Sequence, residues 1–237
     1  MVGKPKFKVA MTATERQRRC RAKKRRQLLT KGDRAPLRTP KPRPEDTEFW
    51  PTPPDLRAAL VRHVIPDLPS GPIWEGAAGD GVLGDDIAAA GREVLMSDID
   101  PQRRGILRHD IHNPPPPETF GMIAVTNLPW SDERLDPFLA RLLFLLDGGH
   151  LRGVTLLLRP DHLSTQGRTA IFNRAASILT CCWRVRWIPG STGQPRWWAV
   201  WVTWLPGVDG PPVTRFREPA KLRADGQRST ARSPAAG

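Results

Sequence analysis

A polar amide, a proline and an indole follow a buried apolar run in the middle of the chain. Residues 121–125 are mostly apolar, and Asn127, Leu128, Pro129 and Trp130 come directly after Thr126. This order predicts a strand that ends in a tight turn, and ligands of open α/β sheets bind beyond such ends. The amide oxygen could accept a hydrogen bond from an exocyclic N–H of a flat base, while the indole stacks on its ring. A strand–turn junction with a capping Asn and a core Trp would show the same residues.

A second segment combines an acid with small residues. Glu75 ends a short strand predicted over residues 72–75, and a helix is predicted over residues 82–90. The small residues of the loop between them are Gly76, Ala77, Gly79 and Gly81. Small residues let the backbone approach a cofactor closely, and strand, loop and helix in this order begin a Rossmann-like sheet. The loop is interpreted as lacking the Gly-x-Gly-x-x-Gly spacing, and a P-loop is not expected, because Glu75 would repel a phosphate and no Gly-Lys-Ser/Thr sequence follows.

Acids also lie at the ends of the next two predicted strands. The strand over residues 93–97 leads into Asp98 and Ile99, and a weaker strand over residues 105–111 carries Asp110. An acid at the tip of the second strand can accept hydrogen bonds from both hydroxyls of a ribose. A turn-forming Asp before a proline would give the same pattern.

The remaining apolar patterns alternate between helices and strands. Helices are predicted over residues 55–65, 135–146 and 168–176, and strands over residues 121–125, 154–158, 179–188 and 197–204. This alternation favours an α/β fold with a mostly parallel sheet, whose last two strands are expected to be antiparallel neighbours. Thr52 lies at the entry to the first of these helices, where its hydroxyl could reach a ligand or serve as an ordinary helix-entry group.

The excess positive charge is confined to the N-terminal arm. Residues 1–45 contain 16 Lys and Arg against three acids, whereas the rest of the chain contains 21 of each sign. A helix predicted over residues 12–29 carries basic side chains on all faces, so it cannot dock on an apolar core. A Pro-rich linker follows it over residues 31–45. The arm predicts binding to a polyanion, unless it serves only as a solvated tail.

Three segments are expected along the chain. Residues 1–45 and 207–237 are predicted to be disordered, and residues 46–206 form the folded domain. No apolar run approaches the roughly 20 residues of a membrane span, and no secretion signal is apparent. Cys20, Cys181 and Cys182 form neither a disulfide framework nor a zinc pattern, so we expect no metal and a cytoplasmic location, with Cys181 and Cys182 packed as small apolar residues.

Together, these segments resemble the class I S-adenosylmethionine-dependent methyltransferases over residues 49–204. The resemblance is greatest to the amino-methyltransferases that modify adenine N6 in DNA, including phage-type members. It implies a Rossmann-like three-layer sandwich around a mostly parallel seven-stranded sheet whose last strand is antiparallel.

The resemblance also assigns roles to particular residues. It implies cofactor binding by Thr52, Glu75, Gly76, Ala77, Gly79, Gly81, Asp98, Ile99 and Asp110. Residues 127–130 match the family's catalytic Asp/Asn/Ser-Pro-Pro-aromatic motif, in which the first side chain and the next carbonyl accept the target amine's N–H groups. The aromatic residue, here Trp130, stacks on a base flipped out of the helix. The family has Pro where this chain has Leu128, but any residue offers the carbonyl.

The implied activity is methyl transfer from S-adenosylmethionine to adenine N6 in DNA, and the basic arm favours a nucleic acid as the partner. The same chemistry on RNA or on a protein glutamine amide is the alternative within the family. A non-catalytic nucleic-acid-binding protein that keeps only the fold is the alternative outside it. Neither the target sequence nor the oligomeric state follows from the residues.

Overall fold

The computed structural model describes residues 50–165, 167–187, 197–208 and 210–218. The basic helix and linker predicted before residue 46 therefore lie outside the described residues, and so do residues 219–237 of the tail. The strands are β1 (Ile73–Glu75), β2 (Val94–Asp98), β3 (Leu107–Arg108), β4 (Ile123–Thr126), β5 (Gly153–Leu158), β6 (Ser177–Val185), β7 (Trp197–Trp204) and β8 (Val213–Arg217). The helices are α2 (Pro54–His63), α3 (Val82–Ala89), α4 (Asp132–Asp147), α5 (Pro160–Leu163) and α6 (Thr169–Asn173), with 3-10 turns η1 (Ile65–Asp67) and η2 (Pro117–Thr119).

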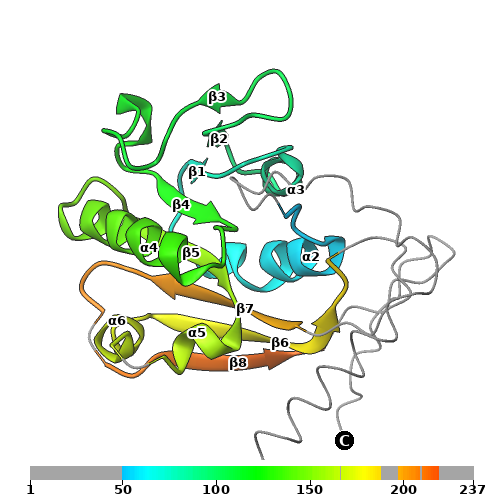
Figure 1. The fold of residues 1–237 in the computed structure, drawn as a ribbon, viewed down its shortest axis with the longest axis vertical. Helices are drawn as coiled ribbons and strands as arrows, with labels where there is room; N and C mark the ends of the chain where they lie inside the picture. The colour runs from blue at the N-terminus through cyan, green and yellow to red at the C-terminus, as the bar shows by residue number, and fades with distance from the viewer. Residues whose placement is uncertain (1–49, 166, 188–196, 209, 219–237) are drawn as a thin grey trace, which may run out of the picture. The chain divides into compact units, whose positions relative to one another are not determined.

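One mixed sheet organises these elements, with its strands in the order β3-β2-β1-β4-β5-β7-β6-β8 (Figure 1). Neighbouring strands from β3 to β5 are parallel, whereas β7 is antiparallel to both β5 and β6. Because β1, β2, β4 and β5 are parallel, their carboxyl ends share one edge of the sheet. The strand order reverses between β1 and β4, which makes this edge a topological switch point. This arrangement confirms the Rossmann-like, mostly parallel α/β fold expected from the sequence.

The eighth strand corrects two expectations. β8 lies in the segment from residue 207 that was predicted to be disordered, and it pairs in parallel with β6 from Ser177–Val213 to Cys181–Arg217. The sheet therefore has eight strands instead of seven, and the antiparallel strand β7 is not the last in the chain. Backbone pairing holds β8, because most of its side chains are exposed. An ion pair between Arg215 and Asp67 also fixes it beside η1.

Helices cover both faces of the sheet, which gives the expected three layers (Figure 1). Ile123 and Val125 of β4 belong to the apolar cluster that includes α2 and α3, whereas Ala124 belongs to the cluster that includes α4. This alternation follows the two-residue period of a strand buried on both sides. The apolar stripe predicted over residues 135–146 packs in the second cluster, as expected. Within the described residues, no helix is long and apolar enough to cross a membrane.

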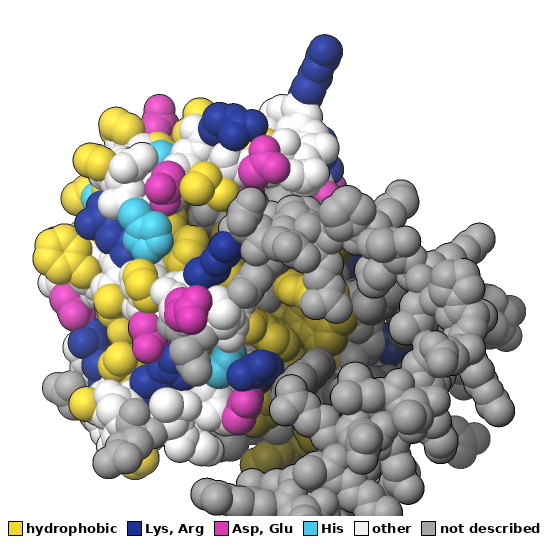
Figure 2. All heavy atoms as spheres, viewed as in Figure 1, with side chains coloured by type: hydrophobic (Ala, Val, Ile, Leu, Met, Phe, Trp, Pro, Cys, Tyr) yellow, Lys and Arg dark blue, Asp and Glu magenta, His cyan; other side chains and the backbone are white. Residues whose placement is uncertain are grey.

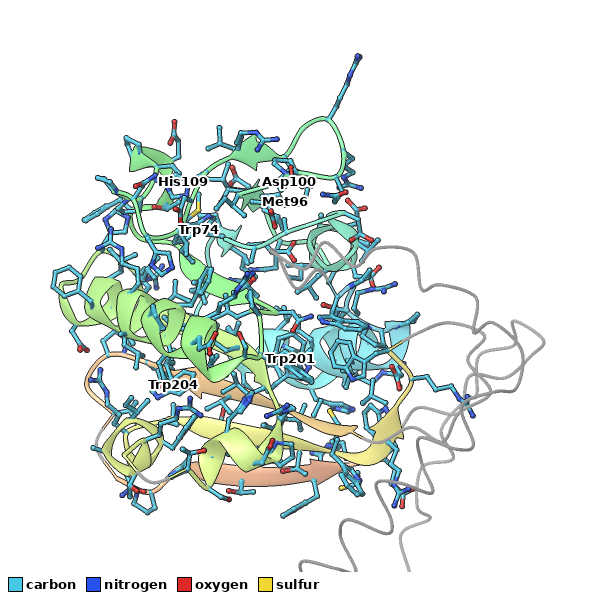
Figure 3. The ribbon with its side chains drawn as sticks, in the orientation of Figure 1. Trp74, Met96, Asp100, His109, Trp201 and Trp204 are labelled. Atoms are coloured by element: carbon cyan, nitrogen blue, oxygen red, sulfur yellow. The ribbon has the colours of Figure 1, made fainter. Side chains whose placement is uncertain are left out.

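Buried tryptophans join the sheet to both helical layers (Figure 3). The indole N–H of Trp201 donates to the Leu56 carbonyl of α2 at 3.1 Å. On the other face, the indole N–H of Trp204 donates to the Ile171 carbonyl of α6 at 2.9 Å. Each ring therefore buries a large apolar surface without leaving its donor unpaired.

The two adjacent cysteines have different environments, although both were expected to pack as apolar residues. Cys181 is fully buried in β6, and burial raises the pKa of its thiol to about 12. Cys182 is exposed, so the expectation was wrong for this residue. Successive residues of a strand face opposite sides of the sheet, and this alternation separates the pair.

Trp201→Ala should lower the free energy of unfolding by about 3–5 kcal/mol, because it opens a cavity between α2 and the sheet. Urea denaturation would measure the change. Phe216→Ala is the matched control, since this aromatic side chain lies on β8 and is 64% exposed. It should stay within about 0.5 kcal/mol of the wild type. Equal stabilities of the two variants would contradict the anchoring role of Trp201.

Candidate active site

A pocket of about 780 Å³, open to solvent, lies at the carboxyl edge of the sheet beside the β1–β4 switch point. It brings together ten of the residues predicted from the sequence. These are Thr52, Glu75, Gly76, Ala77, Asp98, Ile99, Asp110, Asn127, Leu128 and Pro129. The other three predicted residues, Gly79, Gly81 and Trp130, are not among the described residues that line it. Trp50 and His109 line the pocket as well, and neither was predicted as a site residue.

Asp98 connects the second strand to the first loop. One carboxylate oxygen accepts the Gly79 N–H at 2.7 Å, and the other accepts the Asp100 N–H at 2.7 Å. A carboxylate has about four lone-pair sites, so both oxygens keep capacity to accept a further hydrogen bond. The side chain is partly exposed and lines the pocket. Asp98 can therefore accept ligand hydroxyls while it fixes the loop.

Two glycines that do not line the pocket shape the loop through their backbone conformation. Gly79 and Gly81 have φ values of 54° and 78°, in the left-handed region that glycine adopts without strain. Gly84 of α3 follows them at the Gly-x-Gly-x-x-Gly spacing, so the interpretation that this spacing is absent was wrong. A Cβ on Gly84 would lie 2.7 Å from Oε2 of Glu75 and 2.5 Å from the Met96 sulfur. The third glycine therefore lets α3 pack closely on β1 and β2, and its spacing was the signal for it.

Glu75 is buried at the end of β1 with only 2% of its surface exposed. Its Oε2 has no hydrogen-bond partner among the described residues. Burial raises the pKa of this carboxyl well above its ordinary value, and the negative charges of Asp80, Asp98 and Asp85 act in the same direction, although the Gly84 amide opposes them. Oε2 lies close to α3, since a Cβ on Gly84 would be 2.7 Å from it, and the raised pKa favours the neutral, protonated carboxyl.

His109 and Asp110 form the pocket wall that follows β3. The Asp110 carboxylate accepts the His112 N–H at 3.0 Å, and Nε2 of His109 lies 3.0 Å from the Pro114 carbonyl oxygen. The His109 ring stands edge-on to Trp74 at 6.3 Å between centroids, and Figure 3 shows the two side chains close together. The opposite ring nitrogen, Nδ1, is buried without a hydrogen-bond partner among the described residues.

Asn127 is oriented by the segment that precedes α2. Its side-chain N–H donates to the Trp50 carbonyl at 3.0 Å. The neighbouring Thr52 carbonyl accepts a hydrogen bond from Arg57 at 2.6 Å, which ties this segment to α2. With the amide nitrogen engaged, the side-chain oxygen of Asn127 is the atom left to accept from a ligand at the tip of β4.

The Leu128 side chain explains how the turn tolerates a residue other than proline. It is 3% exposed and packs in the apolar cluster with Trp74, Ile111 and Leu135. Asn127 and Pro129 on either side are only partly buried and line the pocket. Burial of Leu128 therefore holds the turn while its two neighbours face the cavity.

Trp130 is held by neighbours that lie far away in the sequence. Its indole N–H donates to the Leu157 carbonyl of β5 at 3.0 Å. Its ring stands edge-on to Trp187 at 4.5 Å and to His162 of α5 at 6.2 Å between centroids. These contacts fix Trp130 at the same edge of the sheet, and its stacking on a base stays a prediction.

A scan against models of known protein families found no match, and a search of curated proteins found none either. Solved structures do resemble this chain. A putative RNA methyltransferase from Pyrococcus horikoshii matches with a TM-score of 0.52 and 16% identity, over 76% of this chain and 97% of that protein. The 23S rRNA methyltransferase ErmE matches with a TM-score of 0.46 and 14% identity, over 68% and 71%.

A type I restriction-modification methyltransferase subunit from Streptococcus thermophilus also matches, with a TM-score of 0.46 and 13% identity over 73% of this chain and 47% of that subunit. At identities this low, the likeness establishes the fold alone. The P. horikoshii structure, which is covered almost completely, places this chain in the Rossmann-like fold seen in methyltransferase structures.

Glu75→Gln should make the stability of the protein less dependent on pH. Because burial raises the pKa of Glu75 in the folded state, wild-type stability is highest with this carboxyl protonated. Wild-type stability falls as the pH rises from the pKa of Glu75 in the unfolded chain to its pKa in the folded protein, by up to about 1.4 kcal/mol per pH unit. Glutamine cannot ionise, so urea denaturation at several pH values should show a shallower decline. Glu93→Gln, at an exposed position, controls for the lost charge. If stability changes with pH equally steeply in Glu75→Gln and in the wild type, Glu75 is not the source of the pH dependence.

Proposed function

We propose that this protein transfers a methyl group from S-adenosylmethionine to the exocyclic N6 amine of adenine in DNA. One observation carries the proposal: Asn127 lies at the tip of β4 with its amide nitrogen held by the Trp50 carbonyl. Its side-chain oxygen is thereby left as an acceptor in the pocket that Asp98 and Glu75 also line. An acceptor held in place beside this pocket is what an aromatic amine needs as a partner.

The residues that line the pocket suit the proposed cofactor in their chemistry. Asp98 keeps lone pairs for ribose hydroxyls, and Asp110 offers a carboxylate for an adenine amine. When bound, the cofactor supplies a methyl group that its sulfonium has already activated.

The side chains of the β4 turn would then prepare the amine. An exocyclic amine is a poor nucleophile, because its lone pair is delocalised into the ring. The Asn127 oxygen and the Leu128 carbonyl, both acceptors, favour a pyramidal nitrogen whose lone pair is directed away from the ring. Holding the amine in this orientation is the main contribution the chain must make, since alignment lowers the barrier of a bimolecular step.

Nucleic acid is the favoured class of substrate because the N-terminal arm carries the entire charge excess of +13. The resemblance of residues 127–130 to motifs that begin with Asn favours adenine over cytosine. RNA is the second candidate, and the P. horikoshii neighbour is itself named a putative RNA methyltransferase. Incubation with tritiated cofactor and unmethylated DNA or RNA, followed by nucleoside digestion, tests the assignment. N6-methyladenine is expected, whereas N4-methylcytosine or label only in protein would refute it.

Asp98→Ala should weaken S-adenosylmethionine binding by about 1–3 kcal/mol, the usual cost of lost hydrogen bonds to a charged group. Isothermal titration calorimetry measures the change directly and does not require a known substrate. Glu118→Ala removes an exposed carboxylate on η2, away from the pocket, and should bind the cofactor as the wild type does. If both variants bind equally well, Asp98 is not a cofactor ligand.

Asn127→Ala should lower turnover at least about 100-fold, with little change in cofactor affinity. The lost acceptor acts mainly on the reacting amine, so the effect belongs to the transition state. Single-turnover methylation and calorimetry with S-adenosylmethionine separate the two quantities. Asn113→Ala, at an exposed asparagine after β3, is the matched control. Turnover close to wild type in Asn127→Ala would remove this residue from the mechanism.

A further inference from the structure

Arg184 and Trp198 form an exposed pair that the proposed chemistry does not use. The guanidinium carbon of Arg184 lies 4.9 Å from the centroid of the Trp198 ring, at cation–π distance. Trp198 is 43% exposed, which is unusual for the largest apolar side chain, and Arg184 is exposed as well. Arg184 has no ion pair with a carboxylate among the described residues. An aromatic ring beside an uncompensated cation is a combination that binds bases and phosphates.

The topology of the sheet places this pair at the edge that carries the pocket. β7 is antiparallel to both β5 and β6, so β6 runs in the same direction as β4 and β5. Arg184 lies near the carboxyl end of β6, and Trp198 lies near the beginning of β7. Both positions therefore belong to the edge where β4 ends at the Asn127 turn.

Trp187 connects the pair's strand to the Asn127 turn. It follows β6 directly, and its ring contacts Trp130 edge-on at 4.5 Å between centroids. Trp130 in turn is bonded to β5 through the Leu157 carbonyl. The segment after β6 is thus packed against the last residue of the Asn127-to-Trp130 turn.

The local charge also suits a polyanion. The described residues of this segment, 184–187 and 197–198, include the exposed Arg184 and Arg186 and no acid. On the face shown in Figure 2, the basic and acidic side chains of the described residues are intermingled. One acid from elsewhere in the chain lies beside the same strand, where the carboxylate of Asp55 accepts from the Trp183 indole.

We propose that Arg184 and Trp198 bind the single-stranded nucleic acid next to the target base. A neighbouring base stacks on the Trp198 ring, and the Arg184 guanidinium neutralises an adjacent phosphate. The assignment rests on the proposed function, because it names a contact for the same substrate outside the pocket. It concerns binding alone and involves no bond making or breaking.

A second Arg–aromatic pair provides the control. Arg141 lies 5.8 Å from the centroid of the Phe144 ring on α4, and Phe144 is 66% exposed. Arg141 also donates to the carbonyl oxygens of Ile111 and Asn113, so it already has a structural role. Phe144→Ala therefore removes the exposed aromatic ring of another Arg–aromatic pair, which lies on a helix, and it leaves the end of β6 unchanged.

The test is binding of a fluorescent oligothymidylate of about twelve nucleotides to the full chain. This probe has no adenine, and about 0.3 M salt weakens the electrostatic contribution of the basic arm. Trp198→Ala should bind about tenfold more weakly, Trp198→Phe should keep most of the affinity, and Phe144→Ala should match the wild type. Arg184→Gln should reduce the slope of log affinity against log salt by about 0.7. An oligouridylate of the same length should respond to these variants in the same way, since stacking and phosphate contacts do not need the sugar.

The outcomes separate this proposal from the proposed function. If Trp198→Ala and Arg184→Gln bind as the wild type does while the protein methylates adenine, the strand-binding role is overturned and the activity stands. If binding depends on Trp198 but no nucleic acid accepts a methyl group, the activity fails and the binding surface stands. Thermal unfolding confirms that each variant is folded, and Trp198→Phe with Arg184→Gln decides the question should Trp198→Ala not fold.

Discussion

The parallel pairing of β1 with β4 is the constraint on which the candidate site depends. Ile73 pairs with Ile123 and Trp74 with Ala124, although about fifty residues of chain separate the two strands. This register brings Glu75 and Asn127 to one edge, and β2 adds Asp98 on the other side of β1. The intervening residues are free to form α3, β2, β3 and a loop that contains Pro114 to Pro117. Backbone hydrogen bonds between the two buried strands already fix the geometry of the strand ends.

Polar groups within the pocket are positioned mainly by backbone atoms. Backbone N–H groups hold Asp98, a backbone carbonyl holds Asn127, and another carbonyl lies beside His109. Such contacts define where each side chain lies and still leave lone pairs on the Asp98 carboxylate and the Asn127 oxygen. Glu75 is the exception, since burial raises its pKa and one of its oxygens has no hydrogen-bond partner in the described part of the chain. The pocket therefore combines preorganised acceptors with one buried carboxyl whose raised pKa favours the neutral form.

Much of the sheet and of the pocket was predictable, because apolar periodicity indicates strands and parallel strand ends converge. β8 was not, since its side chains are mostly exposed and prolines lie close on either side; pairing with β6 alone makes it a strand. The surroundings of Trp130 were also beyond prediction, because His162 and Trp187 reach it only through the fold. Trp50 contributes a backbone carbonyl to the site, which any residue could supply and no side-chain pattern reveals.

Leu128 changes the way in which the Asn127 turn is kept rigid. A proline restricts its own φ angle through a covalent ring and does so in any surroundings. Leu128 fixes the turn by burial among Trp74, Ile111 and Leu135, which holds only while that layer is packed. The orientation of Asn127 is thereby linked to the cooperative core of the domain, so the site should lose its geometry in the same transition that loosens the packing around α4. In this chain, local order at the site is a property of the whole fold.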